Sequence, residues 1–421
     1  MQSSIKLRLT VMNFLQFAVW GAYLTSMGRY LGTAGFGSEI GNFYAMQGLV
    51  SLFMPALMGI VADRWIPAQR LLGVCHTLAG MLMLGVFLYT QTDAPSYPSL
   101  FALYSLSVAF YMPTLALSNS VAYTSLDQAG LDLVKSFPPI RVFGTVGFIC
   151  TMIAVSLLGL EATSGQFAVS AIISLVLAVY AQTLPNCPTA PKGQSKSLVE
   201  ALGLRAFVLF KQRKMALFFI FSMLLGVSLQ ITNGFANPFI STFGEIPAYA
   251  DTFGVKYANI LISLSQLSET LCILLIPFAL RRFGIRRVML IAMVAWVLRF
   301  ALLGLGNPGS GVWLFLLSMI VYGVAFDFFN VAGSLFVDKE TDPSIRSSAQ
   351  GLFMIMTNGI GATLGSLGAQ AVINRFVYSQ SEATAILSGW TTSWYIFAGY
   401  AAVVAVLFAV LFRYNTATEA K

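Results

Sequence analysis

The stretch that decides the fold is IGNFYAMQGLVSLFMPALMGIVA, residues 40–62, which is followed at once by DRW, residues 63–65. The 23 residues from 40 to 62 include no Lys, Arg, Asp or Glu. A helix needs about 20 predominantly apolar residues to cross the hydrocarbon core of a bilayer. Similar apolar runs recur along the whole chain of 421 residues. The sequence therefore predicts an all-α integral membrane protein.

The composition excludes several classes of protein. Hydrophobic residues make up 57% of the chain and charged residues only 10%, against about one quarter charged in soluble domains. This balance excludes a soluble enzyme, a disordered protein and a nucleic-acid binder. The single histidine, His76, excludes a metal site built from several histidines. The chain also lacks GxxxxGK[ST], HExxH and GxSxG strings, so we predict neither an enzyme nor a cofactor.

The apolar runs are bounded by polar residues, Gly or Pro, and they define twelve predicted spans. Their approximate limits are 9–31, 39–62, 71–90, 98–121, 138–159, 166–184, 215–241, 257–280, 288–306, 312–336, 347–373 and 392–412. The first run shows no cleavage-site pattern, so we interpret it as a span. The longest polar stretch between spans is 185–214, and it separates six spans from six. We predict an N-terminal half over 1–184, a cytoplasmic linker over 185–214 and a C-terminal half over 215–421.

The loop cations predict the orientation of these spans, because cytoplasmic loops are enriched in Lys and Arg. With the N-terminus inside, 19 of the 24 Lys and Arg residues fall on the cytoplasmic side. Only Arg29, Lys256 and Arg375 fall on the outer side, and two arginines lie within spans. Both termini are therefore predicted to be cytoplasmic.

The two halves also repeat each other. The string AFY at 109–111 recurs as AFD at 325–327, and nearby Ala and Ser positions recur with the same offset of 216 residues. Together with the central basic linker, this repeat indicates a duplicated transporter of six plus six helices. In such transporters the substrate site lies near the bilayer midplane between the halves.

The string GIVADRW at 59–65, with Arg70 after it, resembles the signature between the second and third helices of the major facilitator superfamily. The usual Gly after the Asp-Arg pair is missing here. The resemblance implies that Asp63 and Arg64 gate the cytoplasmic side while the two halves rock about a central cavity.

Charged residues inside the spans are candidates for function, since a charge at the bilayer centre is costly. Arg141, Glu269 and Asp327 are each accompanied by polar residues at helical spacing, and we assign them to function. Arg299 has no such stripe, and its long side chain could extend to the outer interface. His76, near the inner end of the third span, is interpreted as a structural residue.

Several spans also have a polar stripe along one face, because residues three or four apart lie on one side of a helix. The stripes are Gln16, Trp20 and Tyr23; Arg141, Thr145 and Phe148; Gln230, Asn233 and Asn237; Gln266 and Glu269; and Asp327, Asn330 and Ser334. Amides donate to and accept from hydroxyl groups and base edges, and aromatic rings stack on bases. These faces fit a neutral polyhydroxylated solute with an aromatic part, although a sugar alone would also fit the amides.

Longer strings in both halves resemble the bacterial nucleoside:proton symporter family of the nucleoside and xanthosine permease type. They run in order from about residue 8 to residue 412. They are FLQF at 14–17, WG at 20–21, FMPA at 53–56, FPPIR at 137–141, GTVGF at 144–148, FSMLLG at 221–226, LQITN at 229–233 and FDFFN at 326–330.

The resemblance implies proton-coupled nucleoside uptake across the bacterial cytoplasmic (inner) membrane. It places nucleoside contacts at Arg141, Thr145, Phe148, Gln230, Asn233, Gln266, Glu269, Tyr322, Phe326 and Asp327. We add Asn330 on its helical spacing alone. Uptake would be driven by the proton gradient without a cofactor, and because one chain provides both halves, a monomer suffices.

The charges predict how the proton is coupled. With Arg141 charged and both carboxylates ionised, the cavity has a net charge of −1, which one proton neutralises. Arg141, Glu269 and Asp327 are therefore the proton-coupling candidates. We favour Asp327 as the carrier, because its neighbours are apolar Phe residues while Glu269 has Gln266 nearby. Two alternatives use the same fold: a proton-coupled sugar symporter and a drug/proton antiporter.

Overall fold

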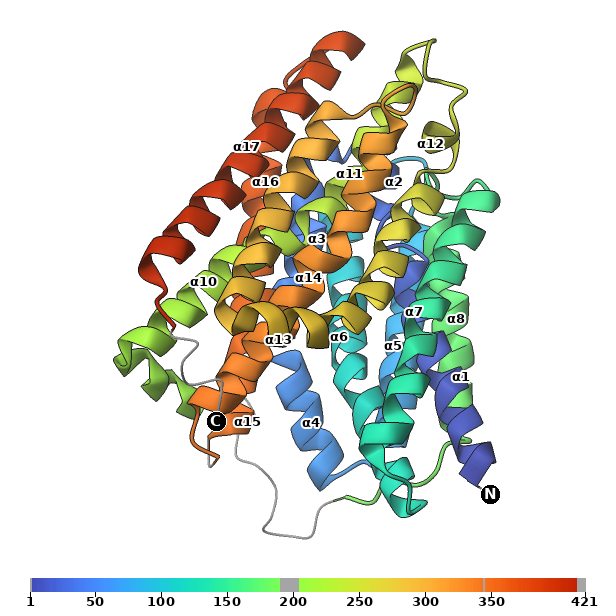
Figure 1. Cartoon of the computed structure of the whole chain (residues 1–421). Coiled ribbons are helices and arrows are strands. Elements are labelled where there is room, and N and C mark those ends of the chain that lie inside the picture. Colours follow the sequence, from blue (N-terminus) through green and yellow to red (C-terminus); the bar gives the residue numbers. More distant parts are fainter. Residues whose placement is uncertain (1, 190–203, 344, 415–421) are drawn as a thin grey trace. The chain divides into compact units, whose positions relative to one another are not determined.

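The structure is a computed structural model that describes residues 2–189, 204–343 and 345–414 (Figure 1). Within these ranges the regular structure is helical and contains no strand. Nine helical stretches of the described residues are long and apolar enough to cross a membrane, and α8 (Gly165–Ala181) is a shorter apolar helix. The predicted all-α membrane class is thus confirmed for the described residues.

The chain divides into two compact units, each described here by itself. The first comprises Met1–Tyr30 with Leu49–Leu202, and the second comprises Leu31–Gly48 with Gly203–Lys421. The helices of the first unit, besides α8, are α1 (Gln2–Gly21), α4 (Met54–Arg64), α5 (Ala68–Tyr89), α6 (Tyr97–Gln128) and α7 (Leu133–Leu157). Two helices cross the boundary between the units, α2 (Met27–Thr33) and α3 (Ile40–Ser51).

The second unit contains the remaining helices. They are η2 (Leu204–Lys211), α10 (Arg213–Leu229), α11 (Ile231–Thr242), η3 (Phe243–Glu245), α12 (Phe253–Lys256), α13 (Ala258–Leu305), α14 (Val312–Glu340), α15 (Arg346–Met354), η4 (Ile355–Gly361), α16 (Ala362–Phe376) and α17 (Ala383–Leu411). A short 3-10 segment, η1 (Gly37–Glu39), precedes α3.

Several predicted spans are interrupted in the structure. The predicted span 39–62 is broken between α3 and α4, where Pro55 occupies the first turn of α4 and has no N–H to continue the earlier helix. The predicted span 215–241 is broken at Gln230, between α10 and α11. The stretch 347–373 contains the π-helical segment η4. None of these breaks contains a Lys, Arg, Asp or Glu residue that would end an apolar run, so hydropathy alone did not reveal them.

Two predicted spans, 257–280 and 288–306, lie within the one element α13. This element reverses at Gly284, which has a φ of 75° and a ψ of 165°. A positive φ of this kind is accessible to glycine at little steric cost. The break therefore separates two membrane-length segments of α13, and α14 packs against this element (Figure 1).

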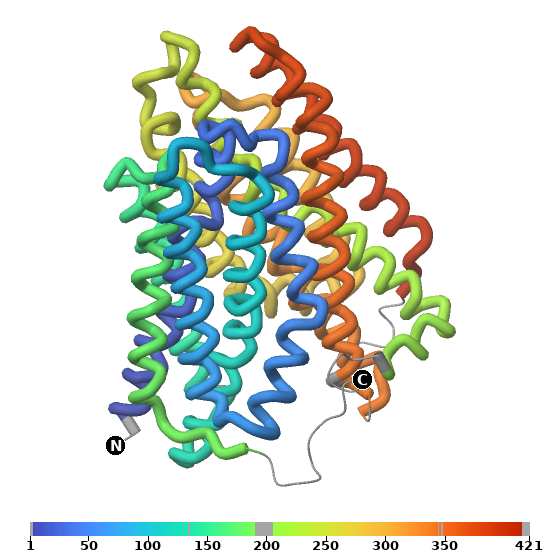
Figure 2. The backbone as a smooth tube through the Cα atoms, turned by 180° about the vertical axis from the view of Figure 1, so that it is seen from behind, coloured from blue at the N-terminus to red at the C-terminus, as the bar shows by residue number. Residues whose placement is uncertain are grey.

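Glycines allow α1 and α7 to approach closely in the first unit. A Cβ added at Gly21 would lie 2.8 Å from the Cα of Phe148, and one at Gly144 would lie 2.6 Å from the ring of Phe17. The close approach fixes Phe17 on α1 beside the stretch of α7 that holds the site candidates. On another side of this unit, α5 packs along α8 (Figure 2).

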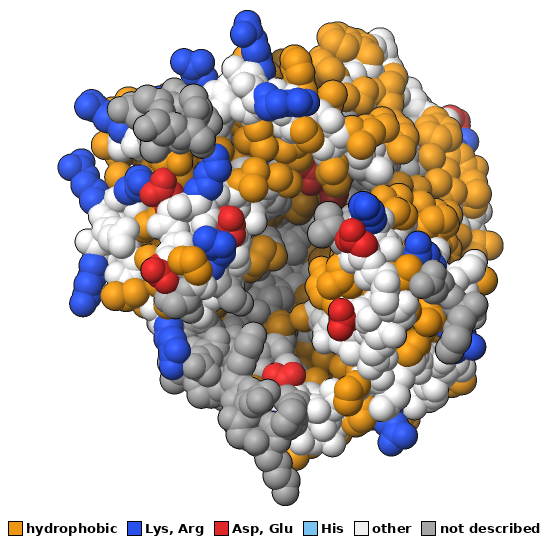
Figure 3. All heavy atoms as spheres, turned by 60° about the horizontal axis from the view of Figure 1, so that its bottom comes forward, with side chains coloured by type: hydrophobic (Ala, Val, Ile, Leu, Met, Phe, Trp, Pro, Cys, Tyr) orange, Lys and Arg blue, Asp and Glu red, His pale blue; other side chains and the backbone are white. Residues whose placement is uncertain are grey.

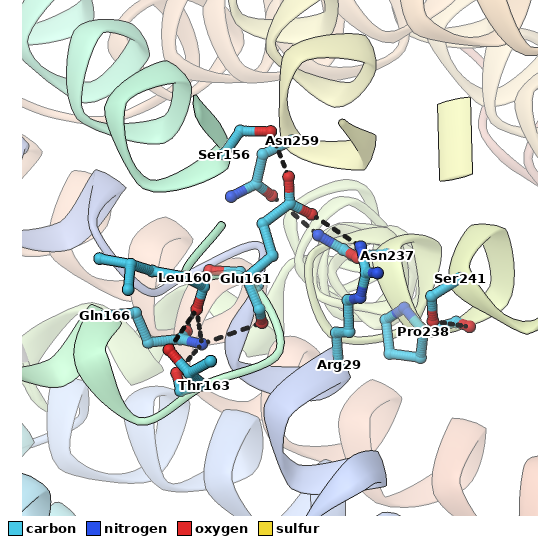
Figure 4. A network of polar contacts seen from close by, with 11 residues as sticks. Arg29, Ser156, Leu160, Glu161, Thr163, Gln166, Asn237, Pro238, Ser241 and Asn259 are labelled. Atoms are coloured by element: carbon cyan, nitrogen blue, oxygen red, sulfur yellow. Dashed lines mark hydrogen bonds and ion pairs between the residues drawn. The ribbon is translucent and has the colours of Figure 1, made fainter. Parts of the chain in front are cut away.

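A buried ion pair holds the connection between α7 and α8 in the first unit. Arg29 Nη1 lies 3.3 Å from Glu161 Oε2, and the Glu161 side chain is only 4% exposed. Ser156 donates a hydrogen bond to the other Glu161 oxygen, and Gln166 donates to the Glu161 carbonyl at 3.1 Å (Figure 4). Arg29, predicted from the loop cations as an outer charge, is thus part of a polar network that fixes this turn.

Hydrogen bonds explain why the segment Leu31–Gly48 belongs to the second unit. The Gln370 amide on α16 accepts a bond from the Gly41 N–H at 2.5 Å and donates to the Gly37 carbonyl at 3.0 Å. Asn374, one turn later, donates to the Ser38 carbonyl at 3.1 Å. A segment of the predicted N-terminal half is therefore bonded directly to α16.

Candidate functional site

Asp327 and Glu269 lie on neighbouring helices, α14 and the first segment of α13. A Cβ added at Gly323, one turn before Asp327, would lie 2.5 Å from the carbonyl oxygen of Ser268. Ser268 also donates a hydrogen bond to the Ile320 carbonyl. This close approach brings Asp327 within electrostatic range of Glu269.

The Asp327 carboxyl group is buried, with 6% of the residue exposed. Its Oδ2 atom has no hydrogen-bond partner among the described residues. An ionised carboxylate in such surroundings is costly, whereas a protonated one is neutral. Glu269, which is half-buried, lies in a less enclosed position. The two carboxyl groups thus differ in their surroundings, and Asp327 is the more enclosed of the two.

A group of aromatic side chains from α13 and α14 includes Tyr322, which interacts with both carboxyl groups. The Tyr322 and Phe326 rings are stacked, with centroids 5.6 Å apart and planes inclined by 19°. Trp296, from the second segment of α13, meets Tyr322 edge-on at 5.9 Å. Tyr322 interacts electrostatically with both Glu269 and Asp327. Four of the predicted site residues therefore form one group on α13 and α14.

The amides of the second unit fall into two sets. Asn233 donates a hydrogen bond to Gln230 Oε1 at 2.9 Å across the break between α10 and α11, and both residues are half-buried. Asn237, the third member of the predicted stripe, instead donates to Asn259 of α13 at 2.9 Å and is fully buried. Asn237 therefore joins two helices, while Gln230 and Asn233 retain partly exposed amides. Gln266 is also half-buried, one turn before Glu269.

In the first unit the structure groups Arg141 and Phe148 with two residues of α1. The Arg141 guanidinium lies 4.0 Å from the centroid of the Phe17 ring. Phe148 is buried and meets the Trp20 ring edge-on at 6.3 Å. The indole Nε1 of Trp20 is buried without a hydrogen-bond partner among the described residues. Phe17 belongs to the string FLQF that resembles the family, but the sequence predicted no role for it.

The histidine lies in a buried hydrogen-bond network of the same unit. His76 Nε2 is 2.8 Å from Gln16 Oε1 and Nδ1 is 2.9 Å from Ser174 Oγ. Gln16 Nε2 donates to Thr114 Oγ1 at 2.7 Å. The network joins α1, α5, α6 and α8. Among the described residues there is no cluster of three or more His, Cys, Asp or Glu side chains that could hold a metal.

The remaining candidates have simpler surroundings. Thr145 on α7 and Asn330 on α14 are half-buried. Asp63 and Arg64 occupy the last two positions of α4, where Asp63 is half-buried and Arg64 exposed. Ser334, the last member of the α14 stripe, donates to Gln350 of α15 at 3.1 Å. Ser334 therefore links helices.

The expectation that Arg299 could extend to the outer interface is wrong. Its side chain lies inside the second unit with only 2% of the residue exposed, and its guanidinium carbon is 4.4 Å from the centroid of the Tyr322 ring. Its polar partners lie on the first segment of α13 and on α14, so the residue spacing along the second segment of α13 does not predict them. A buried arginine thus lies against the group of predicted site residues.

The sequence matches the family described as "Nucleoside H+ symporter" over residues 3–417. It is 49% identical to xanthosine permease and 47% identical to nucleoside permease NupG, both of Escherichia coli strain K12. Each comparison covers 98% of this chain and 97% of the relative. A crystal structure of nucleoside transporter NupG, in a mutant form, superimposes with a TM-score of 0.91 at 45% identity, covering 97% of this chain and all of that one. The chain therefore belongs to the nucleoside H+ symporter family.

Proposed function

We propose that this chain takes up nucleosides together with protons across the bacterial inner membrane, using the residues grouped around Asp327 and Glu269. The observation that carries the proposal is the buried Asp327 carboxyl, with an oxygen unpartnered among the described residues, beside a second carboxyl group. Membership of the nucleoside H+ symporter family supports the substrate and the coupling ion. Its relatives are permeases, and the chain is a transporter rather than an enzyme.

The chemistry of the side chains suits a nucleoside in two ways. Stacked Tyr322 and Phe326 offer an aromatic surface for a base, and stacking of this kind tolerates any base. The half-buried amides of Gln230, Asn233 and Gln266 can donate to and accept from ribose hydroxyls. We place Arg141, Thr145, Phe148 and Asn330 in the same site because the family resemblance and the helical spacing assign them to it.

In the proposed cycle Asp327 takes up a proton from the outer side, and Glu269 and Arg141 set the remaining charge of the site. Protonation removes the cost of a buried carboxylate, so the loaded site can cross between its two accessible states without a net charge. Release of the nucleoside and the proton on the inner side returns the empty carrier. No cofactor takes part in this scheme.

The proposed architecture follows the twelve predicted spans, with an N-terminal half over 1–184, a linker over 185–214 and a C-terminal half over 215–421. Both termini lie in the cytoplasm in this arrangement, and one chain acts as a monomer. Several Lys and Arg side chains lie on the surface shown in Figure 3. Because the cytoplasmic loops of membrane proteins are enriched in Lys and Arg, these side chains support the proposed orientation. The major facilitator fold is supported by the likeness to NupG.

Uptake by cells that overproduce the protein tests the substrate class. Labelled uridine is expected to accumulate above the level of cells with an empty vector, and the accumulation should collapse when a protonophore removes the proton gradient. Labelled lactose serves as the matched solute, since it offers hydroxyl groups without a base. Accumulation of lactose but not uridine would favour the sugar symporter over the nucleoside symporter.

Removing a single amide is expected to weaken nucleoside binding without unfolding the protein. A lost neutral hydrogen bond typically costs about 0.5–1.5 kcal/mol, which corresponds to a rise in Kd of about two- to tenfold. We expect this for Gln230→Ala, Asn233→Ala and Gln266→Ala, measured by calorimetry with purified protein and uridine. The control is Ser334→Ala, which removes a hydroxyl group bonded to α15 and should leave the Kd unchanged. Wild-type affinity in all three amide variants would remove this face from the site.

Asp63→Asn is expected to slow transport while leaving equilibrium binding of uridine close to wild type. Asp63 lies at the end of α4, in the string that resembles the cytoplasmic gate of the superfamily, and the change removes its charge at constant size. Initial uptake rates in proteoliposomes and calorimetric Kd values separate the two effects. A variant that transports at the full rate would show that Asp63 does not act as a gate.

A further inference from the structure

Arg299 is a buried charge that the proposed transport cycle does not use. It lies on the second segment of α13, and only 2% of the residue is exposed. Among the described residues no carboxylate lies within ion-pair distance of its guanidinium. A buried charge without an opposite charge is costly, so its presence needs an explanation other than an ion pair.

The contacts of Arg299 join the two segments of α13 to α14. Its Nη1 donates to the Ser318 carbonyl at 2.9 Å and to Ser265 Oγ at 3.4 Å. Ser318 Oγ donates back to the Arg299 carbonyl at 3.0 Å. The Nε atom is buried without a hydrogen-bond partner among the described residues. Its hydrogen bonds therefore satisfy the guanidinium only in part.

The guanidinium also contacts an aromatic ring. Its carbon lies 4.4 Å from the centroid of the Tyr322 ring, within the range of a cation–π interaction. The same ring is stacked on Phe326 and met edge-on by Trp296. Such an interaction is stronger where the cation is removed from water, as it is here. The guanidinium thus contacts one ring of the aromatic group directly.

Tyr322 also connects Arg299 to the carboxyl groups. The Arg299 charge interacts electrostatically with Tyr322. Tyr322 in turn interacts electrostatically with Glu269 and Asp327. Phe326 and Asp327 follow Tyr322 along the same helix. A change at Arg299 can therefore reach the proposed substrate site through Tyr322, although Arg299 is not assigned to that site.

We propose that Arg299 is a positioning residue that fixes the Tyr322 ring, and with it the Tyr322–Phe326 stack, in the orientation that receives the nucleoside base. The inference rests on the proposed function, in which these two rings form the stacking surface. A ring that is already held in its binding orientation loses less conformational freedom when the ligand arrives, and this raises affinity.

The test compares uridine affinity and thermal stability in Arg299→Met, Tyr322→Leu and the double variant of the purified full chain. Replacing a buried ion by an apolar group of similar volume is often neutral or stabilising. Arg299→Met should therefore keep or raise the melting temperature while raising the Kd about three- to tenfold. Tyr322→Leu should raise the Kd about tenfold or more. The double variant should bind as Tyr322→Leu does, because Arg299 acts through that ring.

Two further variants keep the test decisive. Ser318→Ala removes the hydroxyl bond to the Arg299 backbone but leaves the guanidinium over the ring, so its Kd should equal that of the wild type. Arg299→Lys keeps a cation near the ring without the planar guanidinium, and it should give an intermediate Kd. Should Arg299→Met fail to fold, Arg299→Lys decides the matter, since wild-type affinity in that variant would overturn the positioning role.

The outcomes distinguish this inference from the proposed site. Wild-type affinity in Tyr322→Leu would overturn the stacking surface, and the role of Arg299 with it. Weak binding by Tyr322→Leu together with wild-type binding by Arg299→Met would overturn the role of Arg299 alone. Additive losses in the double variant would show that Arg299 affects binding by a route other than Tyr322.

Discussion

Asp327→Asn is expected to abolish accumulation of nucleoside against a gradient while leaving nucleoside exchange. Asn keeps the size and much of the hydrogen-bonding capacity of Asp, but it holds the position permanently neutral. The buried carboxyl can then no longer take up and release a proton, so an imposed pH gradient cannot drive uptake. Proteoliposomes containing the variant should show counterflow of labelled uridine, which needs no net proton movement, and no pH-driven accumulation.

Glu269→Gln is the matched control, because it neutralises the neighbouring carboxyl group in the same way. Glu269 is less enclosed than Asp327, and the family resemblance assigns it a nucleoside contact as well. We expect this variant to bind uridine more weakly and to retain some pH-driven accumulation. Accumulation by the Asp327 variant together with its loss in the Glu269 variant would assign the proton to Glu269.

Gly323→Ala is expected to cause the largest loss of stability among these substitutions. A Cβ at this position would lie 2.5 Å from the Ser268 carbonyl oxygen and 2.7 Å from the Cys272 sulfur, so α13 and α14 must separate. Overpacking of this kind typically costs about 1–3 kcal/mol. The separation would also part Asp327 from Glu269. The melting temperature and the uridine affinity of the purified variant should therefore both fall.

Gly368→Ala provides the comparison for this substitution. Gly368 lies on α16, and a Cβ there meets no atom within 4 Å. Alanine is favoured over glycine inside a helix by about 1 kcal/mol, so this variant should melt at the wild-type temperature or above it. Equal melting temperatures for both variants would mean that the contact between Gly323 and Ser268 does not limit the packing of α13 on α14.

The sequence predicted the membrane class and the polar faces because both leave regular patterns. A run such as 40–62 follows from the thickness of the bilayer, and pairs such as Gln230 and Asn233 follow from helical spacing. The breaks at Gln230 and before Pro55 were not predicted, since apolar residues continue on both sides of each break. Asn237 shares the spacing of the Gln230 stripe, yet its amide is bonded to Asn259.

Arg299 shows most clearly what one-dimensional patterns omit. Its partners are on other parts of the fold: Ser265 lies on the first segment of α13, and Ser318 and Tyr322 lie on α14. The reversal of the chain at Gly284 brings them together. Contacts between residues of different segments cannot be predicted from the spacing of polar residues within a single span. Phe17 beside Arg141 is a second contact of this kind.

Proton movement on addition of nucleoside tests the central claim most directly. Proteoliposomes that contain the wild-type protein and an internal pH indicator are given uridine on the outside, without an imposed pH gradient. The account predicts acidification of the interior with uridine, no change with lactose, and no change with uridine when Asp327→Asn replaces the wild type. Uridine entry without acidification, or with alkalinisation of the interior, would contradict coupled symport.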